Sequence, residues 1–251
     1  MAMQFPPIAD NPHLRAIERQ FGTISVAPET LPEPVQFVFI CFTNRCGSNH
    51  LADAMQSDGR LNMAGELFNA DAVLEDTRLH GHASFAEYLR LQVSWRMRGG
   101  RFVVKTAIPH LDLLGRAGVL DAVQAAAHFV FLTREDRLAQ AISYDIAEQS
   151  GQWVAGTPSR GAPTYSRERL ERIMRGIAEQ NGLFEEFFAL NAIAPVRLTY
   201  EAFVADRPRG LAAIGAAIGL PDLRLVPAAL RHARQSGPLN AAWRARYRAG
   251  D

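Results

Sequence analysis

A buried-strand pattern that runs directly into a helix pattern limits the possible folds of this chain more than any other feature. Residues 35–43 are nearly all apolar, β-branched or aromatic, which is typical of a strand buried on both faces. From Ser48 the apolar positions recur three and four residues apart, which predicts a helix that Ser48 or Asn49 is suited to cap. The turn between them, residues 44–47, would direct backbone N–H groups and the positive end of a helix dipole at one place, where phosphate binds readily. An ordinary first strand–helix unit of an α/β domain has the same pattern.

Composition narrows the class of protein. A chain of 251 residues with 48% hydrophobic content suits one large domain, or one domain with additions, around a substantial core. The net charge of +1 argues against a general nucleic-acid binder. No apolar run approaches the about 20 residues of a membrane helix, so we expect no membrane span. Residues 1–34 carry six prolines and no apolar signal-peptide core. We therefore expect an N-terminal extension over 1–34 and an α/β domain over 35–251.

The two cysteines, Cys41 and Cys46, fall on the first predicted strand and in the turn after it. This placement is poor for a disulfide bond, and without histidine companions the pair gives no metal signature. A reducing cytoplasm is the compartment that this cysteine usage favours.

Lys105 is the one lysine among 27 basic residues, the other 26 being arginine. A coding bias toward arginine explains most of this imbalance. A functional interpretation is that Lys105 needs the compact ammonium group of lysine, which the planar fork of arginine cannot replace.

Three further strands alternate with helices along the chain. The strands are expected at residues 101–106, 128–133 and 196–200, and the helices at 13–20, 83–97, 109–116, 119–127, 136–149, from 166 onward for more than twenty residues, and at 211–218. Residues 60–82, which are acidic and carry histidines, and residues 151–165 are expected to be loops. Such alternation predicts a parallel sheet with ligands outside its carboxyl edge. Residues 44–48, Lys105 and Arg134 would then share one rim.

The turn at residues 44–47 does not have the Gly-Lys-Ser/Thr ending of the NTPase phosphate loop. Its sequence Arg45-Cys46-Gly47-Ser48 instead resembles the phosphosulfate-binding loop of sulfotransferases that use 3′-phosphoadenosine-5′-phosphosulfate (PAPS). The resemblance is to the bacterial trehalose 2-sulfotransferase family and its nodulation-factor relatives. Asn49, where relatives usually carry threonine, departs from the pattern.

Other motifs of this family follow in the expected order. Glu66, within the segment Gly-Glu-Leu-Phe-Asn, resembles the acidic loop segment of the family. Arg134 at a strand end and Ser143 nine residues later resemble the 3′-phosphate signature of PAPS enzymes. Trp153 matches a family tryptophan, and residues 198–203 resemble the Tyr-Glu motif that ends a late strand in many sulfotransferases.

The resemblance implies a P-loop-NTPase-like parallel sheet flanked by helices, with sulfotransferase architecture, and PAPS as co-substrate. Arg134 and Ser143 would hold its 3′-phosphate. The 5′-phosphosulfate would be cradled by the backbone N–H groups of four consecutive residues, Cys46, Gly47, Ser48 and Asn49, with the Ser48 hydroxyl adding a contact. No metal ion is needed for this chemistry, and the sequence shows no cluster of metal ligands.

The implied reaction is sulfuryl transfer to a hydroxyl of a carbohydrate or glycolipid acceptor. Glu66 would act as general base, and Arg45 and Lys105 would offset charge on the departing phosphate oxygen. Three histidines are rival candidates for the base: His50, His80 and His82. The arginine-rich tail at residues 231–248 suits a solvated helix or a phosphate clamp.

Two alternative functions remain open. One is a nucleotide or sugar kinase on a degenerate phosphate loop, and the other is a catalytically silent nucleotide-binding module. The expected partner is the acceptor, with no nucleic acid, and the chain is compatible with a homodimer.

Overall fold

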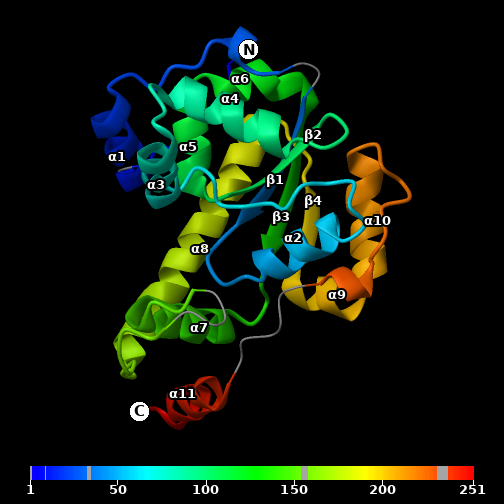
Figure 1. Ribbon diagram of the computed structural model, residues 1–251. Coiled ribbons are helices and arrows are strands. Elements are labelled where there is room, and N and C mark those ends of the chain that lie inside the picture. Colours follow the sequence, from blue (N-terminus) through cyan, green and yellow to red (C-terminus); the bar gives the residue numbers. More distant parts are fainter. Residues whose placement is uncertain (1, 9, 33–34, 154–157, 231–236) are drawn as a thin grey trace.

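Four parallel strands form the centre of the part of the chain that the structure describes (Figure 1). The structure is a computed structural model that describes residues 2–8, 10–32, 35–153, 158–230 and 237–251. The strands lie in the order β2-β1-β3-β4, and their bounds are β1 (Gln36–Phe42), β2 (Arg101–Thr106), β3 (Ala127–Thr133) and β4 (Val196–Thr199). The predicted α/β class with a parallel sheet flanked by helices is therefore confirmed.

β1 is an inner strand that is buried on both faces. Phe37 and Phe39 belong to one core cluster, while Val38 and Ile40 belong to the cluster on the opposite face. Both faces are covered, which is why the strand reads as a continuous apolar run rather than as an alternating pattern. β1 pairs with β2 on one side and with β3 on the other, both in parallel. From β1 the chain continues to β2 on one side of the strand and then to β3 on the other side, so the strand order reverses at β1. Ligands of open α/β sheets bind outside the carboxyl ends of the strands at such a point, which here is next to the turn that follows β1.

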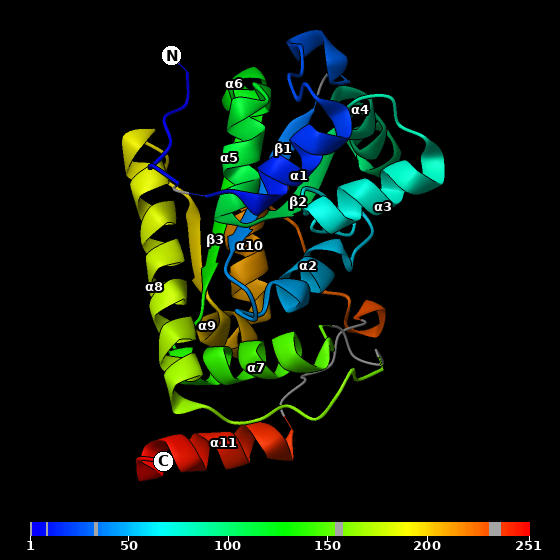
Figure 2. The ribbon, with the colours of Figure 1, turned by 90° about the vertical axis from the view of Figure 1, so that its left-hand side faces the viewer.

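Helices cover both faces of the sheet and its carboxyl edge (Figures 1 and 2). The helices on the Phe37 face are α1 (Pro12–Phe21), α3 (Ala70–His80), α4 (Phe85–Arg96), α5 (Ile108–Arg116), α6 (Val119–Val123) and α8 (Arg167–Leu190). Those on the Val38 face are α2 (Ser48–Gln56), α9 (Tyr200–Ala205) and α10 (Arg207–Ala217). Short 3-10 turns lie at Pro28–Thr30, Gln124–Ala126 and Pro227–Ala229.

α7 (Arg137–Ser150) and α11 (Pro238–Ala249) lie side by side below the carboxyl ends of the strands in Figure 2. They share a small apolar cluster with α8, in which Trp243 of α11 is buried beside Ile142 of α7. The C-terminal helix is therefore packed against the edge of the sheet at which a ligand is expected.

The described part of residues 1–34 packs on the rest of the chain. Leu14 and Ile17 of α1 belong to the core cluster on the Phe37 face. The Asn11 side chain donates a buried hydrogen bond of 2.8 Å to Asp112. The division of the chain at residue 34 stays a prediction.

The main difference from the sequence prediction lies in residues 60–82, which were expected to form a loop. The structure has helix α3 there, capped by the Asn69 side chain, which accepts a hydrogen bond of 3.0 Å from the N–H of Asp71. Its buried stripe consists of only Ala70, Val73 and Thr77, so the apolar signal of the helix is weak.

Smaller corrections concern helix ends. The N-cap of α2 is Gly47, so the prediction of Ser48 or Asn49 as the cap is wrong, and α2 begins at Ser48. The strand predicted to reach residue 200 ends at Thr199, whose side chain caps the short helix α9. α10 begins at Arg207, four residues before the predicted start at 211.

Parts of two predicted segments, the loop at 151–165 and the tail at 231–248, lie outside the described residues. Within the described residues, no helix combines the length and the apolar character that a membrane crossing requires.

Candidate active site

The turn between β1 and α2 has an unusual backbone. Arg45 has a φ of 64° and Gly47 a φ of 101°, both in the left-handed region. Alternation of right- and left-handed residues turns successive N–H groups toward one side, which forms an anion-binding concavity at the start of a helix. The turn itself is closed by a hydrogen bond of 3.2 Å from the N–H of Cys46 to the carbonyl of Thr43.

Gly47 is required at its position for two reasons. An L-residue with a side chain rarely adopts its φ, and a Cβ atom there would collide with the ring of Tyr200. Tyr200 opens α9 directly after β4. The Tyr-Glu motif after β4 is thus in contact with the phosphate-loop candidate after β1.

Lys105, on β2, lies at one end of the site. Its ammonium group donates hydrogen bonds to Oδ1 of Asn49 on α2 and, at 2.9 Å, to Oε1 of Glu66. The Lys105 side chain is only 7% exposed, whereas that of Glu66 is 35% exposed. Three side chains from three separate segments therefore meet, and the carboxylate among them is open to the solvent side.

Asn62 fixes the segment that carries Glu66 to β2. Its side-chain amide donates to the carbonyl of Val103 and accepts from the N–H of Val103, both at 2.7 Å. Three residues later the carbonyl of Gly65 accepts a hydrogen bond of 2.9 Å from the N–H of Lys105. Residues 62–65 therefore cover the outer edge of β2 and set the position of Glu66 relative to Lys105. Asn62 was not predicted as a site residue, since nothing in its local sequence distinguishes it from a surface asparagine.

The other end of the site is formed by Arg45, Ser143 and Arg134. The Arg45 guanidinium donates to Oγ of Ser143 at 2.9 Å and to the carbonyl of Trp153 at 2.8 Å. The Arg134 guanidinium donates to the carbonyl of Arg45 at 3.2 Å. Burial, followed by the nearby charge of Arg134, lowers the pKa of Arg45 from its usual value. Two partly buried cations thus lie together, an arrangement that favours a bound anion.

The Tyr-Glu motif holds Arg134 in place. The Arg134 guanidinium lies 4.9 Å above the centre of the Tyr200 ring, and its Nε is 3.8 Å from Oε1 of Glu201. The Glu201 carboxylate also accepts hydrogen bonds from the backbone N–H groups of Glu135 and Asp136, at 3.0 and 3.3 Å. The motif therefore positions the start of α7 as well as the side chain of Arg134.

Both ends open into one cavity of about 910 Å³. Eight of the nine predicted site residues line this cavity, and so does His50, one of the three rival candidates for the base. The eight are Arg45, Gly47, Ser48, Asn49, Glu66, Lys105, Arg134 and Ser143. Cys46 is the exception. It is fully buried, and burial raises the pKa of its thiol to about 12, so it is a packing residue of the turn. Its N–H donates to the carbonyl of Thr43 within the turn. It is therefore not available to the cradle that was predicted from the N–H groups of residues 46–49.

Some lining residues were not predicted, and two predicted ones lie elsewhere. Arg244 and Asn240 of α11 line the cavity, and Arg244 forms an ion pair with Asp136. His80 and His82 are not among the described residues that line it. Only the arginine-rich composition of the tail could have pointed to Arg244.

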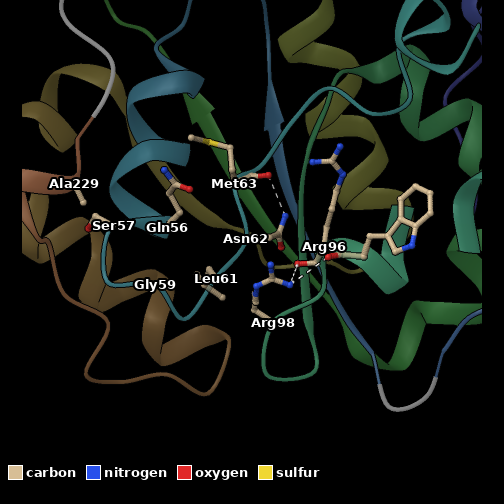
Figure 3. Close-up of a pocket in the computed structure, with 10 residues that line it drawn as sticks. Gln56, Ser57, Gly59, Leu61, Asn62, Met63, Arg96, Arg98 and Ala229 are labelled. Atoms are coloured by element: carbon tan, nitrogen blue, oxygen red, sulfur yellow. Dashed lines mark hydrogen bonds between the residues drawn. The ribbon is translucent and has the colours of Figure 1, made fainter. Parts of the chain in front are cut away.

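A second hollow, of about 600 Å³, lies between the end of α2 and the end of α4 (Figure 3). It shares Met63 with the first cavity. Arg96 donates a hydrogen bond of 2.8 Å to Gln92, and Arg98 donates to the carbonyls at the end of α4. Both guanidinium groups thus form hydrogen bonds within the wall of this hollow. All the predicted site residues except Cys46 line the larger cavity instead.

The residues of the larger cavity fit a nucleotide with two anionic ends. Three arginines and one lysine line it, and its volume lies in the range of ligand pockets. Arginines suit phosphate because the guanidinium fork can donate two parallel hydrogen bonds.

The structure is an α/β protein whose first strand leads into a turn with the backbone geometry of anion-binding sites. The family model described as Stf0 sulphotransferase matches residues 96–250, more than half of the chain, and the chain therefore belongs to this family. The matched region contains Lys105, Arg134 and Ser143. The resemblance on which the sequence prediction was based is confirmed.

A curated relative is the trehalose 2-sulfotransferase of Mycobacterium tuberculosis (strain ATCC 35801 / TMC 107 / Erdman). It is 29% identical over 136 residues, which cover 53% of this chain and 50% of the relative. The chain thus spans about half the length of the curated relative that it matches.

Proposed function

We propose that this protein transfers a sulfuryl group from PAPS to a hydroxyl of a carbohydrate or glycoconjugate. The observation that carries the proposal is that one cavity has the Glu66–Lys105 pair at one end and the Arg45–Ser143–Arg134 group at the other. The first arrangement suits proton removal and charge stabilisation, and the second suits recognition of a phosphate.

Arg134 and Ser143 would bind the 3′-phosphate of the donor, as the resemblance implies. The hydrogen bond from Arg45 to Ser143 supports a change in the role of Arg45, from the departing phosphate oxygen to this same end of the nucleotide. The N–H groups at the start of α2, with the Ser48 hydroxyl, would bind the 5′-phosphosulfate. Trp153, which is 40% exposed and lines the cavity, offers an aromatic face for the adenine.

PAPS supplies an activated sulfuryl group, and the protein mostly has to position groups and stabilise charge. Glu66 would accept the proton of the acceptor hydroxyl as the new oxygen–sulfur bond forms. Lys105 would offset the negative charge that develops on the phosphate oxygen as the old bond breaks. Lys105 also orients the Glu66 carboxylate, because its ammonium donates to Oε1 and leaves Oε2 for the acceptor.

The acceptor would lie on the side of the cavity that carries Met63, Gly65, Asn69 and Asp71, next to Glu66. Amide and carboxylate groups of this kind are suited to hydrogen-bond sugar hydroxyls. The name of the mycobacterial relative makes trehalose the first acceptor to test. A cytoplasmic location and a homodimer stay predictions.

The test uses adenosine 3′,5′-bisphosphate, the product that PAPS leaves. It should raise the melting temperature of the protein, because a ligand that binds only the native state stabilises that state. Arg134→Ala should abolish the shift. Glu66→Gln should keep the shift and lose turnover with PAPS and trehalose, by about 10²–10⁴-fold for the loss of a general base.

Other results would contradict the proposal. Stabilisation by ATP and Mg²⁺ but not by the bisphosphate would favour the kinase. Binding of the bisphosphate without transfer to any sugar, lipid or phenolic acceptor would favour the silent nucleotide-binding module.

A further inference from the structure

Three side chains that can bind a metal ion converge at the C-terminal end of α3, away from the cavity. They are Asp76, His80 and His82, whose possible ligand atoms all lie within 4.8 Å of one another. The expectation that the chain has no cluster of metal ligands is therefore corrected. We propose that these three residues bind a divalent transition-metal ion, Zn²⁺, in a structural site that joins α3 to the start of α4.

The local fold brings the three ligands together. Asp76 and His80 are four residues apart and so lie on the same face of α3. Gly81, with a φ of 72°, ends the helix in the left-handed conformation, and the chain turns so that His82 faces back toward Asp76. Nε2 of His82 lies 2.7 Å from Oδ2 of Asp76.

The spacing of the ligand atoms is close to that of a tetrahedral site. Nδ1 of His80 lies 3.3 Å from Oδ1 of Asp76. Bonds of about 2.0–2.2 Å to Zn²⁺ place tetrahedral ligand atoms roughly 3.3–3.6 Å apart. The two contacts are made with different oxygens of the Asp76 carboxylate, and the 2.7 Å contact of His82 would lengthen by about 0.6–0.9 Å to reach this spacing. Nδ1 of His80 also lies 3.0 Å from the backbone carbonyl of Asp76, and the 48% exposure of this side chain leaves room for the ring to turn from that carbonyl toward an ion.

The surroundings orient the ligands as the surroundings of metal sites do. Gln92 of α4 donates a hydrogen bond of 2.9 Å to Oδ2 of Asp76. His82 has a side chain only 2% exposed and packs edge-on against Tyr88, with ring centres 5.5 Å apart. Such outer contacts fix the direction of ligating groups and contribute to metal affinity.

The ligand types select the metal. A set of two imidazoles and one carboxylate favours Zn²⁺, which readily binds nitrogen ligands. Ca²⁺ and Mg²⁺ bind oxygen ligands instead. Three protein ligands leave a fourth position, and the exposure of His80 lets water or an entering ion reach it. Because α3 begins at Ala70, soon after Glu66, the ion would stabilise a helix next to the candidate active site.

The test starts from protein that has been stripped with a chelator and dialysed. Zn²⁺ alone should then bind at one equivalent per chain and raise the melting temperature by several degrees. Co²⁺ in its place should give the intense visible absorption of a tetrahedral ion. His80→Ala, whose side chain is partly exposed, and Asp76→Asn should each weaken binding at least tenfold.

Arg78→Ala is the matched control, because Arg78 lies on the same turn of α3 and is paired with Glu75 outside the cluster. This variant should bind Zn²⁺ like the unaltered protein. Absence of the Zn²⁺-dependent shift in the unaltered protein would overturn the site, and the three side chains would then form a hydrogen-bonded group only. Equal shifts in His80→Ala and the unaltered protein would overturn it too. The bisphosphate shift should persist in His80→Ala, so this test is independent of the proposed function.

Discussion

The ammonium of Lys105 donates a 2.9 Å hydrogen bond to the carboxylate of Glu66, 39 residues earlier in the chain. The Lys105 side chain is nearly buried, beside the ring of Phe42, with its nitrogen 5.3 Å from the ring centre. A buried ammonium needs partners, and Asn49 and Glu66 supply them. The single lysine of the chain therefore joins the helix after β1 to the segment that carries the candidate base.

Lys105→Arg should reduce turnover strongly although it keeps the positive charge. The guanidinium is larger and planar, so it cannot donate to both Asn49 and Glu66 from the space that the ammonium occupies. We expect kcat to fall by about 10²-fold or more, in line with the loss of one stabilising contact to developing charge. Steady-state kinetics measures this, and the melting shift with the bisphosphate is the control for donor binding. An unchanged kcat would remove Lys105 from the reaction.

Asn62→Ala should lower both the stability and kcat. The change leaves the N–H and carbonyl of Val103 without their side-chain partner at the edge of β2, at a cost of about 1–3 kcal/mol for each buried group left unpaired. The segment 62–65 would then hold Glu66 less firmly. Urea unfolding gives the stability, and kcat against KM for the donor separates the two effects.

Asn62→Asp is the matched variant for this position, since it keeps the size and the acceptor but loses the donor to Val103. The stability and kcat of this variant should both be at least as low as those of Asn62→Ala. The reason is that the new carboxylate would face the carbonyl of Val103, and two acceptors repel each other. Normal kcat in both variants would show that Asn62 does not position Glu66.

Gly47→Ala should impair donor binding as well as stability. The new methyl group would have a strained φ and would displace the Tyr200 ring, on which Arg134 rests. Gly59→Ala is the control, because Gly59 has a φ of 81° but nothing lies within 4 Å of the added carbon. The strain alone should cost roughly 1–2 kcal/mol in both variants. Only Gly47→Ala should also reduce the shift with the bisphosphate, and equal shifts in the two variants would contradict the role of Tyr200.

The stability of the protein should fall as the pH is lowered below 6.5, partly because of His110. This histidine is fully buried, and burial, followed by the charges of His13 and Lys105, lowers its pKa to about 3. Between pH 6.5 and about 3, this histidine is therefore protonated in the unfolded chain but neutral in the folded chain. The stabilisation is therefore fully present above pH 6.5 and is lost as the pH falls toward 3, by up to about 1.4 kcal/mol per pH unit.

His110→Asn keeps an acceptor for the N–H of Ala107, to which Nδ1 of His110 is now hydrogen-bonded at 3.2 Å, but it does not titrate. Urea unfolding between pH 7 and pH 5 should show a smaller slope for this variant than for the unaltered protein. His13, whose pKa is also lowered by burial, should account for part of the slope that remains. Equal slopes would show that His110 is not the group responsible.

The sequence by itself determined the parallel sheet and its rim. Apolar runs such as residues 37–42 and 102–104 favour strands buried on both faces, and the helices between them favour parallel pairing. The predicted bounds of β2 agree with the structure, and Lys105 and Arg134 follow from where the strands end. These features depend on patterns within about ten residues, so no knowledge of packing was needed.

The tertiary structure alone decided which side chains work together. The contact of Arg45 with Ser143 joins residues 98 apart, and that of Asn62 with Val103 joins residues 41 apart. The grouping of His80 and His82 with Asp76, and their distance from the cavity, depended on α3, whose weak apolar stripe gave no clear period. Hydrogen bonds between distant segments leave no periodic trace in the sequence, because their geometry is fixed only when helices and strands pack. That is why the sequence predicted the rim, while the partners of each residue on it came from the fold.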